Sequence, residues 1–388
     1  MPLSPRERLL RLLQGEPIDR IPWFPRIDLW YNYHQRQETL PPDYRLSMDE
    51  IIAKIGGGIY RRGVSIYHEK LQNLEIEIQY SDPAWRRRIE AAEDPLGGNY
   101  ILALIVQSLL SAKNDVFIKF KSIVGLTRNE VRVNVKTPQG EVAAKFVTSE
   151  ILQEAGIRPV QSEYFIKDIS RDSSAVQYFI QNIKLVPDFQ NFKQVSNQVG
   201  EKGVVWARTS PYYSPLHQLM YIYMGLERTF LDLYDHRSKV EELLECIAHQ
   251  LHQVQAICLD SPADFISHGG NFDATVIGPQ HFAAYFVPYF AEFAQKLHSR
   301  GKFLVVHVDG EMKTLMPLFP QTQADIAEGF TPSPMTSVPL PEALDLWRGQ
   351  VVIWGGIPAS ILSSNTPAEN FTTTSSTFCR PAKRIISS

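Results

Sequence analysis

The sequence has few cysteines, no glycine-rich nucleotide-binding motif and no long apolar run. Its three cysteines, Cys246, Cys258 and Cys379, are too few and too scattered for a disulfide framework, which predicts a reducing, cytoplasmic location. The longest apolar stretch, residues 101–110, is interrupted by polar residues and falls short of the roughly 20 residues that a membrane helix needs. We therefore expect no membrane span.

The sequence also lacks an excess of charge of either sign. Its 39 Lys and Arg residues and 42 Asp and Glu residues give a formal net charge of -3. This balance gives no reason to expect nucleic acid or an anionic membrane surface as a partner, so a small-molecule substrate is expected. With 388 residues, 44% of them hydrophobic, the chain can bury a substantial core.

The N-terminal part begins with two capped helices. Ser4 can cap a leucine-rich helix that should end near Gly15. Ser47 with Glu50 forms a capping box for a second helix. Between them, residues 20–25 predict a short strand. This strand should enter a loop that carries Asp28, Trp30 and Tyr31.

Three segments then show the alternating apolar pattern of half-buried strands, residues 74–80, 131–135 and 142–147. Proline and glycine in residues 137–140 predict a turn between the last two. We expect a small antiparallel β excursion over about 74–147.

From about residue 203, short apolar strands alternate with amphipathic helices. This order is typical of parallel βα units. It predicts an α/β protein with a (β/α)8 TIM-type barrel over residues 1–362. An open doubly wound sheet is the alternative, which the missing glycine-rich motif disfavours. Residues 363–388 are rich in serine and threonine and predict a disordered tail, so the barrel should be incomplete at its C-terminal end.

Polar residues at the predicted strand ends have the best claim to chemistry, because the active sites of βα barrels lie there. They come after three strands in turn and could bind a divalent metal, move protons or hold a polar substrate. His307 and Asp309, two residues apart, could share one cation or proton; equally, His307 could bond inside the barrel while Asp309 caps a helix. The candidates are His268, Asn271 and Asp273, then His307 and Asp309, then Glu328.

Other residues could bind substrate. The paired Arg61 and Arg62 suit bidentate capture of carboxylates or phosphates, although solvated surface charge also explains them. Asp28, Trp30 and Tyr31 could line a ligand face, although such aromatic residues more often belong to a core. Tyr212 and Tyr213 follow a predicted strand and could line the site, or form a rigid loop bounded by prolines.

Five segments together resemble the uroporphyrinogen decarboxylase superfamily. The resemblance covers most of the chain and implies a (β/α) barrel with a cleft at the strand C-termini, often in a homodimer. It rests on Arg6–Pro22, Thr137–Gly140, Gly278-Pro279 with residues 286–289, His307–Gly310 and Trp354–Pro358.

The resemblance implies either methyl transfer or decarboxylation. The decarboxylase motifs Arg-Gln-Ala-Gly-Arg and Phe-Ser-Asp are absent, which favours a methyltransferase-like enzyme that uses a corrinoid or other methyl carrier on a partner protein. The zinc methyltransferases of the superfamily carry a His-x-Cys pair, and here Asp309 stands in place of that cysteine. Zinc held by His307 and Asp309 is therefore an expectation, with Glu328 as a further catalytic residue.

Two alternatives remain open. The first is a carboxy-lyase acting on a porphyrinogen-like tetrapyrrole, with Arg61 and Arg62 holding its carboxylates. The second is a non-catalytic or degraded paralogue that binds a ligand, which the irregular residues 94–126 and 363–388 suggest.

Overall fold

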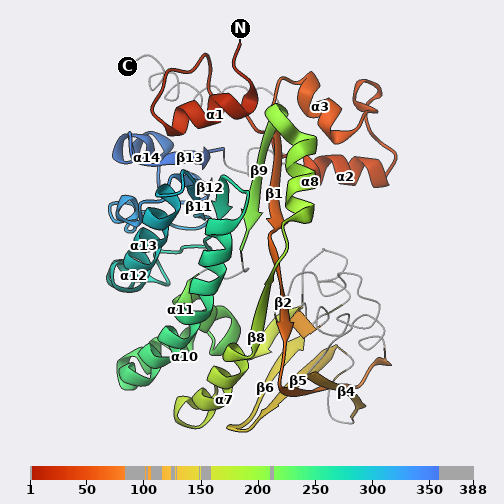
Figure 1. Ribbon diagram of the computed structural model, residues 1–388, viewed down its shortest axis with the longest axis vertical. Helices are drawn as coiled ribbons and strands as arrows, with labels where there is room; N and C mark the ends of the chain where they lie inside the picture. The colour runs from red at the N-terminus through yellow and green to blue at the C-terminus, as the bar shows by residue number, and fades with distance from the viewer. Residues whose placement is uncertain are drawn as a thin grey trace. The chain divides into compact units, whose positions relative to one another are not determined.

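The fold is described from a computed structural model of the chain (Figure 1). The described residues are 2–83, 101, 104–105, 116–123, 127, 129–147, 149, 159–209 and 214–357. The chain divides into two compact units that each contain separate segments. Unit 1 comprises Met1–Ile66, Phe189–Thr209 and Cys258–Ser388, and unit 2 comprises Tyr67–Asp188 and Ser210–Ile257.

Unit 1 is built on a parallel sheet of six strands in the order β1-β9-β10-β11-β12-β13. From β9 onward the order in the sheet follows the order in the chain, as expected when each strand is connected to its neighbour by a helical crossover. The strands are β1 (Ile59–Ser65), β9 (Gly203–Arg208), β10 (Phe265–Ser267), β11 (Phe303–His307), β12 (Ile326–Phe330) and β13 (Val352–Gly355).

Helices cover this sheet and its end. α8 lies along β1 and β9 (Figure 1), and α13 packs against β11. Capping side chains begin α1 and α3: Ser4 accepts a hydrogen bond from the Glu7 amide, and Ser47 with Glu50 forms the expected capping box. The helices are α1 (Pro5–Leu13), α2 (Asp28–Arg36), α3 (Met48–Lys54), α8 (Gln190–Val199), α12 (Gly278–His281), α13 (Val287–His298) and α14 (Leu340–Leu346).

The sheet is curled, because side chains from its first and last strands meet. The rings of Tyr60 on β1 and Trp354 on β13 have centroids 5.1 Å apart, and Trp206 on β9 contacts both, at 4.7 Å each. In a flat sheet, strands five places apart would be separated by roughly 24 Å. The sheet therefore has the curvature of part of a TIM-type barrel, and the described residues supply six of its parallel strands.

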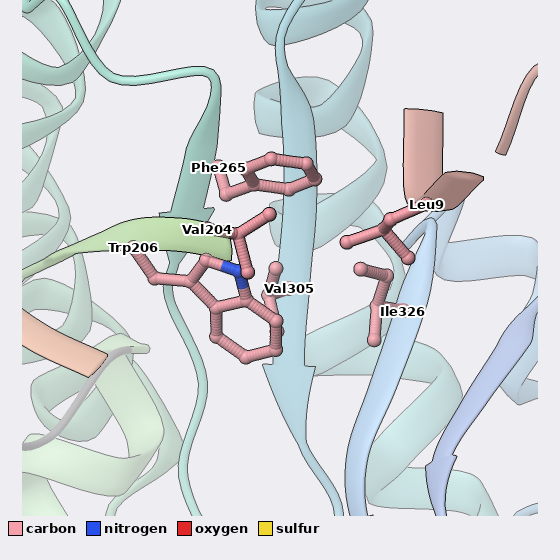
Figure 2. Packing of buried hydrophobic residues seen from close by; sticks show 6 residues of the cluster. All are labelled: Leu9, Val204, Trp206, Phe265, Val305 and Ile326. Carbon is pink, nitrogen blue, oxygen red and sulfur yellow. The ribbon is translucent and has the colours of Figure 1, made fainter. Parts of the chain in front are cut away.

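The concave side of this sheet holds an apolar core that α1 closes. Figure 2 shows Leu9 of α1 directed toward buried side chains of four strands, all at most 1% exposed. Packing of this kind fills a barrel interior with side-chain layers and leaves no pore. The core residues are Leu9, Val204, Trp206, Phe265, Val305 and Ile326.

Unit 2 contains two smaller sheets. Its five strands in the order β4-β3-β5-β6-β7 pair antiparallel except for β3 and β4, which are parallel, and β2 pairs antiparallel with β8. The strands are β2 (Tyr67–Leu71), β3 (Leu74–Tyr80), β4 (Val116–Ser122), β5 (Glu130–Thr137), β6 (Gly140–Val147), β7 (Val160–Glu163) and β8 (Ile183–Pro187). The helices are α7 (Ile169–Gln181), α9 (Pro215–Gln218), α10 (Leu226–Asp235) and most of α11 (Arg237–Asp260).

Most elements expected from periodicity are present. The three alternating segments are β3, β5 and β6, with the expected antiparallel pairing and turn, and the strands from residue 203 onward lie within two residues of their expected bounds. An α/β fold with a curled parallel sheet is thus confirmed, and a full eight-stranded barrel stays a prediction. The division at residue 362 and the tail stay predictions too, since residues 358–388 lie outside the described part of the chain.

The expectation for residues 20–31 is wrong. Residues 21–27 form no strand, and Asp28, Trp30 and Tyr31 lie in helix α2, not in a loop. Pro22 and Pro25 have no backbone N–H groups, so they cannot donate hydrogen bonds to a neighbouring strand. Asp28 lies in the first turn of α2, where a negative charge stabilises the helix N-terminus. Among the described residues no helix is long and apolar enough to cross a membrane.

Candidate functional site

A polar layer is formed by side chains of three strands in unit 1, with His307 at the carboxyl end of β11, Glu328 within β12 and Arg62 within β1. Side chains of a strand alternate between faces, so His307 shares the face of buried Val305 on β11, and Glu328 shares that of buried Ile326 on β12. The strand register places His307 directly opposite Glu328. Arg62 comes from β1, the strand at the far end of the sheet order. The curl of the sheet therefore gathers residues that are far apart in the sequence.

Glu328 is the centre of this layer. One carboxylate oxygen, Oε1, accepts a hydrogen bond from Arg62 Nη1 at 3.0 Å, and the other, Oε2, accepts one from His307 Nδ1. The exposed fractions of the side chains rise from 11% for Glu328 to 26% for His307 and 46% for Arg62. The carboxylate is thus enclosed, while the imidazole and guanidinium can be reached by a ligand.

The pairing decides the ionisation of Glu328. Burial alone would raise the pKa of its carboxyl, but the hydrogen bond from His307 and the positive charges of Arg62 and Arg26 hold the pKa below its ordinary value. Glu328 is therefore a carboxylate at neutral pH. A carboxylate that accepts from Nδ1 fixes the imidazole tautomer in which Nε2 carries the lone pair.

Two neighbouring features shape the layer. Gly329 has a φ of 80°, and a Cβ there would lie 2.6 Å from Cε1 of His307, so glycine provides both the backbone conformation and the room for the imidazole. The buried hydroxyl of Tyr60 and indole N–H of Trp206 have no hydrogen-bond partner in the described structure. Burial, with the charge of Glu328, raises the pKa of Tyr60.

His268 is placed in a different environment. It is completely buried, its Nδ1 is 2.9 Å from Thr209 Oγ1, and its Nε2 is 2.9 Å from the Tyr289 hydroxyl. Its ring also packs against Phe290 and Phe293 of α13. The structure thus brings His307 together with Glu328 and places His268 against a helix, with partners that stabilise a buried imidazole.

The residues that follow β10 and β11 lie in loops. Asp309 is exposed, and its Oδ1 accepts a hydrogen bond from Thr331 Oγ1 at 3.4 Å. Asp273 accepts from the amide and hydroxyl of Thr275, and Asn271 is exposed. The bonds of Asp273 are those of a turn, and the substrate contacts expected for Asn271 and Asp273 stay predictions.

The two adjacent arginines point to different partners. Arg61 makes two hydrogen bonds to Asp49, at 2.6 and 2.7 Å, whereas Arg62 binds Glu328. Side-chain alternation along β1 separates them, so they do not form one paired anion site. Asp28 lies 3.2 Å from Arg26 Nε.

The aromatic candidates are only partly described. Trp30, on the exposed helix α2, contacts the rings of His34 and Tyr44, with centroids 5.1 and 6.1 Å apart. Tyr31 is half-buried on the same helix. Tyr212 and Tyr213 lie outside the described residues, so their expected role stays a prediction.

The donor set does not fit zinc. Among the described residues there is no group of three or more His, Cys, Asp or Glu side chains that could hold a metal ion. His307 directs Nδ1 to Glu328, Asp309 bonds to Thr331, and the cation Arg62 already occupies the other Glu328 oxygen. Structural and catalytic zinc sites take at least three protein ligands, so no zinc-dependent step is assigned to this layer.

Residues 210–369 match the family model of uroporphyrinogen decarboxylase. This segment is therefore similar to that family, and it includes β10 to β13 with His307 and Glu328. Arg62 lies outside it. A methyltransferase from Methanosarcina mazei is similar in structure, with a TM-score of 0.42 and 13% sequence identity over 97% of this chain and 99% of that chain. No curated protein matches the chain.

Several residues of the polar layer could not be found from the sequence. The segment of β1 has no strand pattern, so Tyr60 had no predicted position, and Arg62 was expected to act together with Arg61, whereas it binds Glu328. Gly329 directly follows a candidate residue and was the available signal, because a glycine at a strand end often allows a close approach. Nothing in the sequence around Arg26 indicates that its charge acts on Glu328.

Proposed function

We propose that the chain is a methyltransferase-like enzyme of the uroporphyrinogen decarboxylase superfamily, and that His307 with Glu328 is its proton-transfer centre. The hydrogen-bonded series Arg62–Glu328–His307 at the strand ends supports this best. The family match over residues 210–369 supports it too, because His307 and Glu328 both lie within the matched segment.

In this proposal His307 activates the methyl acceptor. Glu328 holds the imidazole through Nδ1, so Nε2 can take a proton from a thiol or similar group as that group attacks the methyl carbon. The bond between the methyl carbon and its carrier would break in the same step, and the electron pair of that bond would stay on the carrier. The ionised Glu328 then stabilises the imidazolium that forms, as a carboxylate does beside a catalytic histidine. No metal is needed to lower the pKa of the acceptor in this scheme.

Arg62 has two roles in the proposal. Its charge helps to keep Glu328 ionised. Of the five N–H donors of Arg62, one makes a hydrogen bond to a residue that the structure describes. The half-exposed guanidinium can therefore also bind an anionic group of the acceptor. Arg62 would thereby hold the acceptor close to Nε2 of His307.

The methyl carrier is part of the proposal. A corrinoid, when bound, supplies a methyl group that can be transferred to a nucleophile. The partial exposure of His307 and Arg62 fits a carrier that approaches the strand ends. A corrinoid protein as partner and a homodimer stay predictions from the resemblance.

A decarboxylase is the second candidate, and one observation favours it. The charges of Arg26 and Arg62 both act on Glu328, and exposed arginines around a proton donor could hold the carboxylates of a porphyrinogen-like substrate. In that reaction His307 would deliver the proton that replaces the departing carbon dioxide.

Parallel assays separate the two functions. Methylcobalamin with a panel of thiols tests methyl transfer, and uroporphyrinogen tests decarboxylation. We expect methyl transfer by the wild type, and His307→Ala and Glu328→Gln should each lower kcat/KM by about 10²–10⁴-fold, the usual contribution of general acid–base catalysis.

The matched control is His298→Ala. His298 bonds to Asp325 at 2.9 Å, so it is also a histidine–carboxylate pair, but Asp325 precedes the first residue of β12, whereas Glu328 lies within the strand. This variant should keep wild-type kcat/KM. Coproporphyrinogen formation by the wild type would favour the decarboxylase, and unchanged methyl transfer in His307→Ala would refute the proton-transfer role.

A further inference from the structure

Unit 2 contains a cavity of about 250 Å³. None of the residues that line it belongs to the polar layer. It is lined by β5, β6 and the segment leading into α7, including Arg132, Asn134, Glu141 and Lys167. Its volume is below the roughly 300–1,000 Å³ of pockets for drug-sized molecules. The cavity therefore suits a ligand about the size of an amino acid.

Most charges around the cavity already have partners. Arg171 binds Asp172 through two hydrogen bonds of 2.7 and 3.1 Å. Lys167 Nζ donates to the main-chain oxygens of Ala143 and Tyr164. These groups are structural: Lys167 links the segment before α7 to β6, and Arg171 and Asp172 pair with each other within α7.

Two opposite charges remain. Arg132 and Glu141 both line the cavity, and within the described ranges neither forms an ion pair. Their neighbours on the sheet do: Lys136 binds Glu75 at 3.4 Å, and Lys145 binds Glu163 at 2.8 Å. The cavity thus offers one guanidinium and one carboxylate to a ligand.

Asn134 is the third available group. It is 4% exposed and lines the cavity, and its carboxamide makes no hydrogen bond to any residue that the structure describes. The carboxamide faces the open space of the cavity, where it can hydrogen-bond a polar ligand.

The strand register places these three groups on one face. Asn134 on β5 pairs with Ala143 on β6, and the strands are antiparallel. Arg132 lies two residues before Asn134 and Glu141 two residues before Ala143, so both share the face of Asn134 and extend from it in opposite directions. The result is the guanidinium of Arg132, a central amide and the carboxylate of Glu141 in line. The residues opposite the two charges are Lys145 and Lys136, which pair with Glu163 and Glu75.

We propose that this cavity binds a small zwitterion of the amino-acid class. Its carboxylate would bind Arg132, its ammonium group would bind Glu141, and Asn134 would hydrogen-bond between them. The site uses residues of unit 2 alone and does not depend on the proposed methyl transfer.

Ligand binding to the full chain tests this. The common amino acids are screened one at a time for a rise in Tm, beside succinate and putrescine as probes with charges of one sign. Kd values for the amino acids that raise Tm come from calorimetry. Arg132→Gln and Glu141→Gln should each weaken binding by about tenfold, the loss expected for one charge-assisted contact.

Arg237→Gln is the matched control. Arg237 is an exposed arginine of unit 2, on α11, that pairs with Glu241 at 3.6 Å and does not line the cavity. Its Kd should equal that of the wild type. The proposal is overturned if no amino acid raises Tm, if neither cavity variant changes Kd, or if succinate binds as tightly as the best amino acid.

Discussion

Three histidines of unit 1 have different surroundings, and these surroundings decide which of them can transfer a proton. His307 and His298 each bind a carboxylate, and His268 binds a threonine and a tyrosine hydroxyl. Only His307 has its carboxylate among further cations and at the carboxyl end of the sheet. The surroundings, and not the imidazole, make His307 the best candidate for proton transfer.

The ionisation of Glu328 predicts a dependence of stability on pH. The folded state lowers the pKa of Glu328, so the unfolded chain binds this proton more readily. Its contribution to stability is present above the unfolded pKa of about 4.3 and is lost as pH falls through the lower folded pKa.

We therefore expect the free energy of unfolding of wild type to fall more steeply in this acidic window than that of Glu328→Gln. Urea denaturation at a series of pH values measures both. The difference between the two proteins isolates Glu328 from other acidic groups, and two parallel curves would show that its pKa is not lowered by folding.

At the scale of elements, α1 has the clearest structural task. Its Ser4 cap and leucine-rich face were evident in the sequence, and the structure buries Leu9 against strands β9 to β12 (Figure 2). A nine-residue helix is marginal by itself in water, so α1 depends on this packing.

Leu9→Ala should lower the free energy of unfolding by about 2–5 kcal/mol, because it leaves a cavity in the core. Chemical denaturation measures the change. Arg11→Ala on the same helix is the control: Arg11 is partly exposed and pairs with Glu7, and loss of a surface ion pair changes stability by only about 0–1 kcal/mol. Equal losses in both variants would mean that Leu9 does not fill the core.

Elements with strong periodicity could be predicted from the sequence, and others could not. β9 to β13 are short apolar runs between amphipathic helices, a local signal. β1 carries two arginines and a glycine and has a register irregularity, so its sequence gives no strand period. α2 buries none of its residues, and a helix without a buried face has no apolar period to recognise.

At the scale of the whole molecule, the candidate site depends on the curl of the parallel sheet. Strand order from β10 to β12 follows from the sequence, and with it the closeness of His307 and Glu328. The approach of β1 to β13 could not be predicted, because it comes from contacts between residues nearly 300 positions apart, such as Tyr60 and Trp354. Arg62 reaches Glu328 only through that approach.

A double-mutant cycle between the two outer strands tests the curl directly. Tyr60→Leu and Trp354→Leu each remove one ring of the contact, and aromatic pairs contribute about 0.5–1.5 kcal/mol beyond their buried area. We expect the double variant to deviate from additivity by that amount in free energies of unfolding. Trp347, which packs on Phe319 and Phe330, gives the control pair: Tyr60→Leu with Trp347→Leu should be additive within about 0.5 kcal/mol. Additivity in both cycles would mean that β1 and β13 do not meet, and that Arg62 cannot be held beside Glu328.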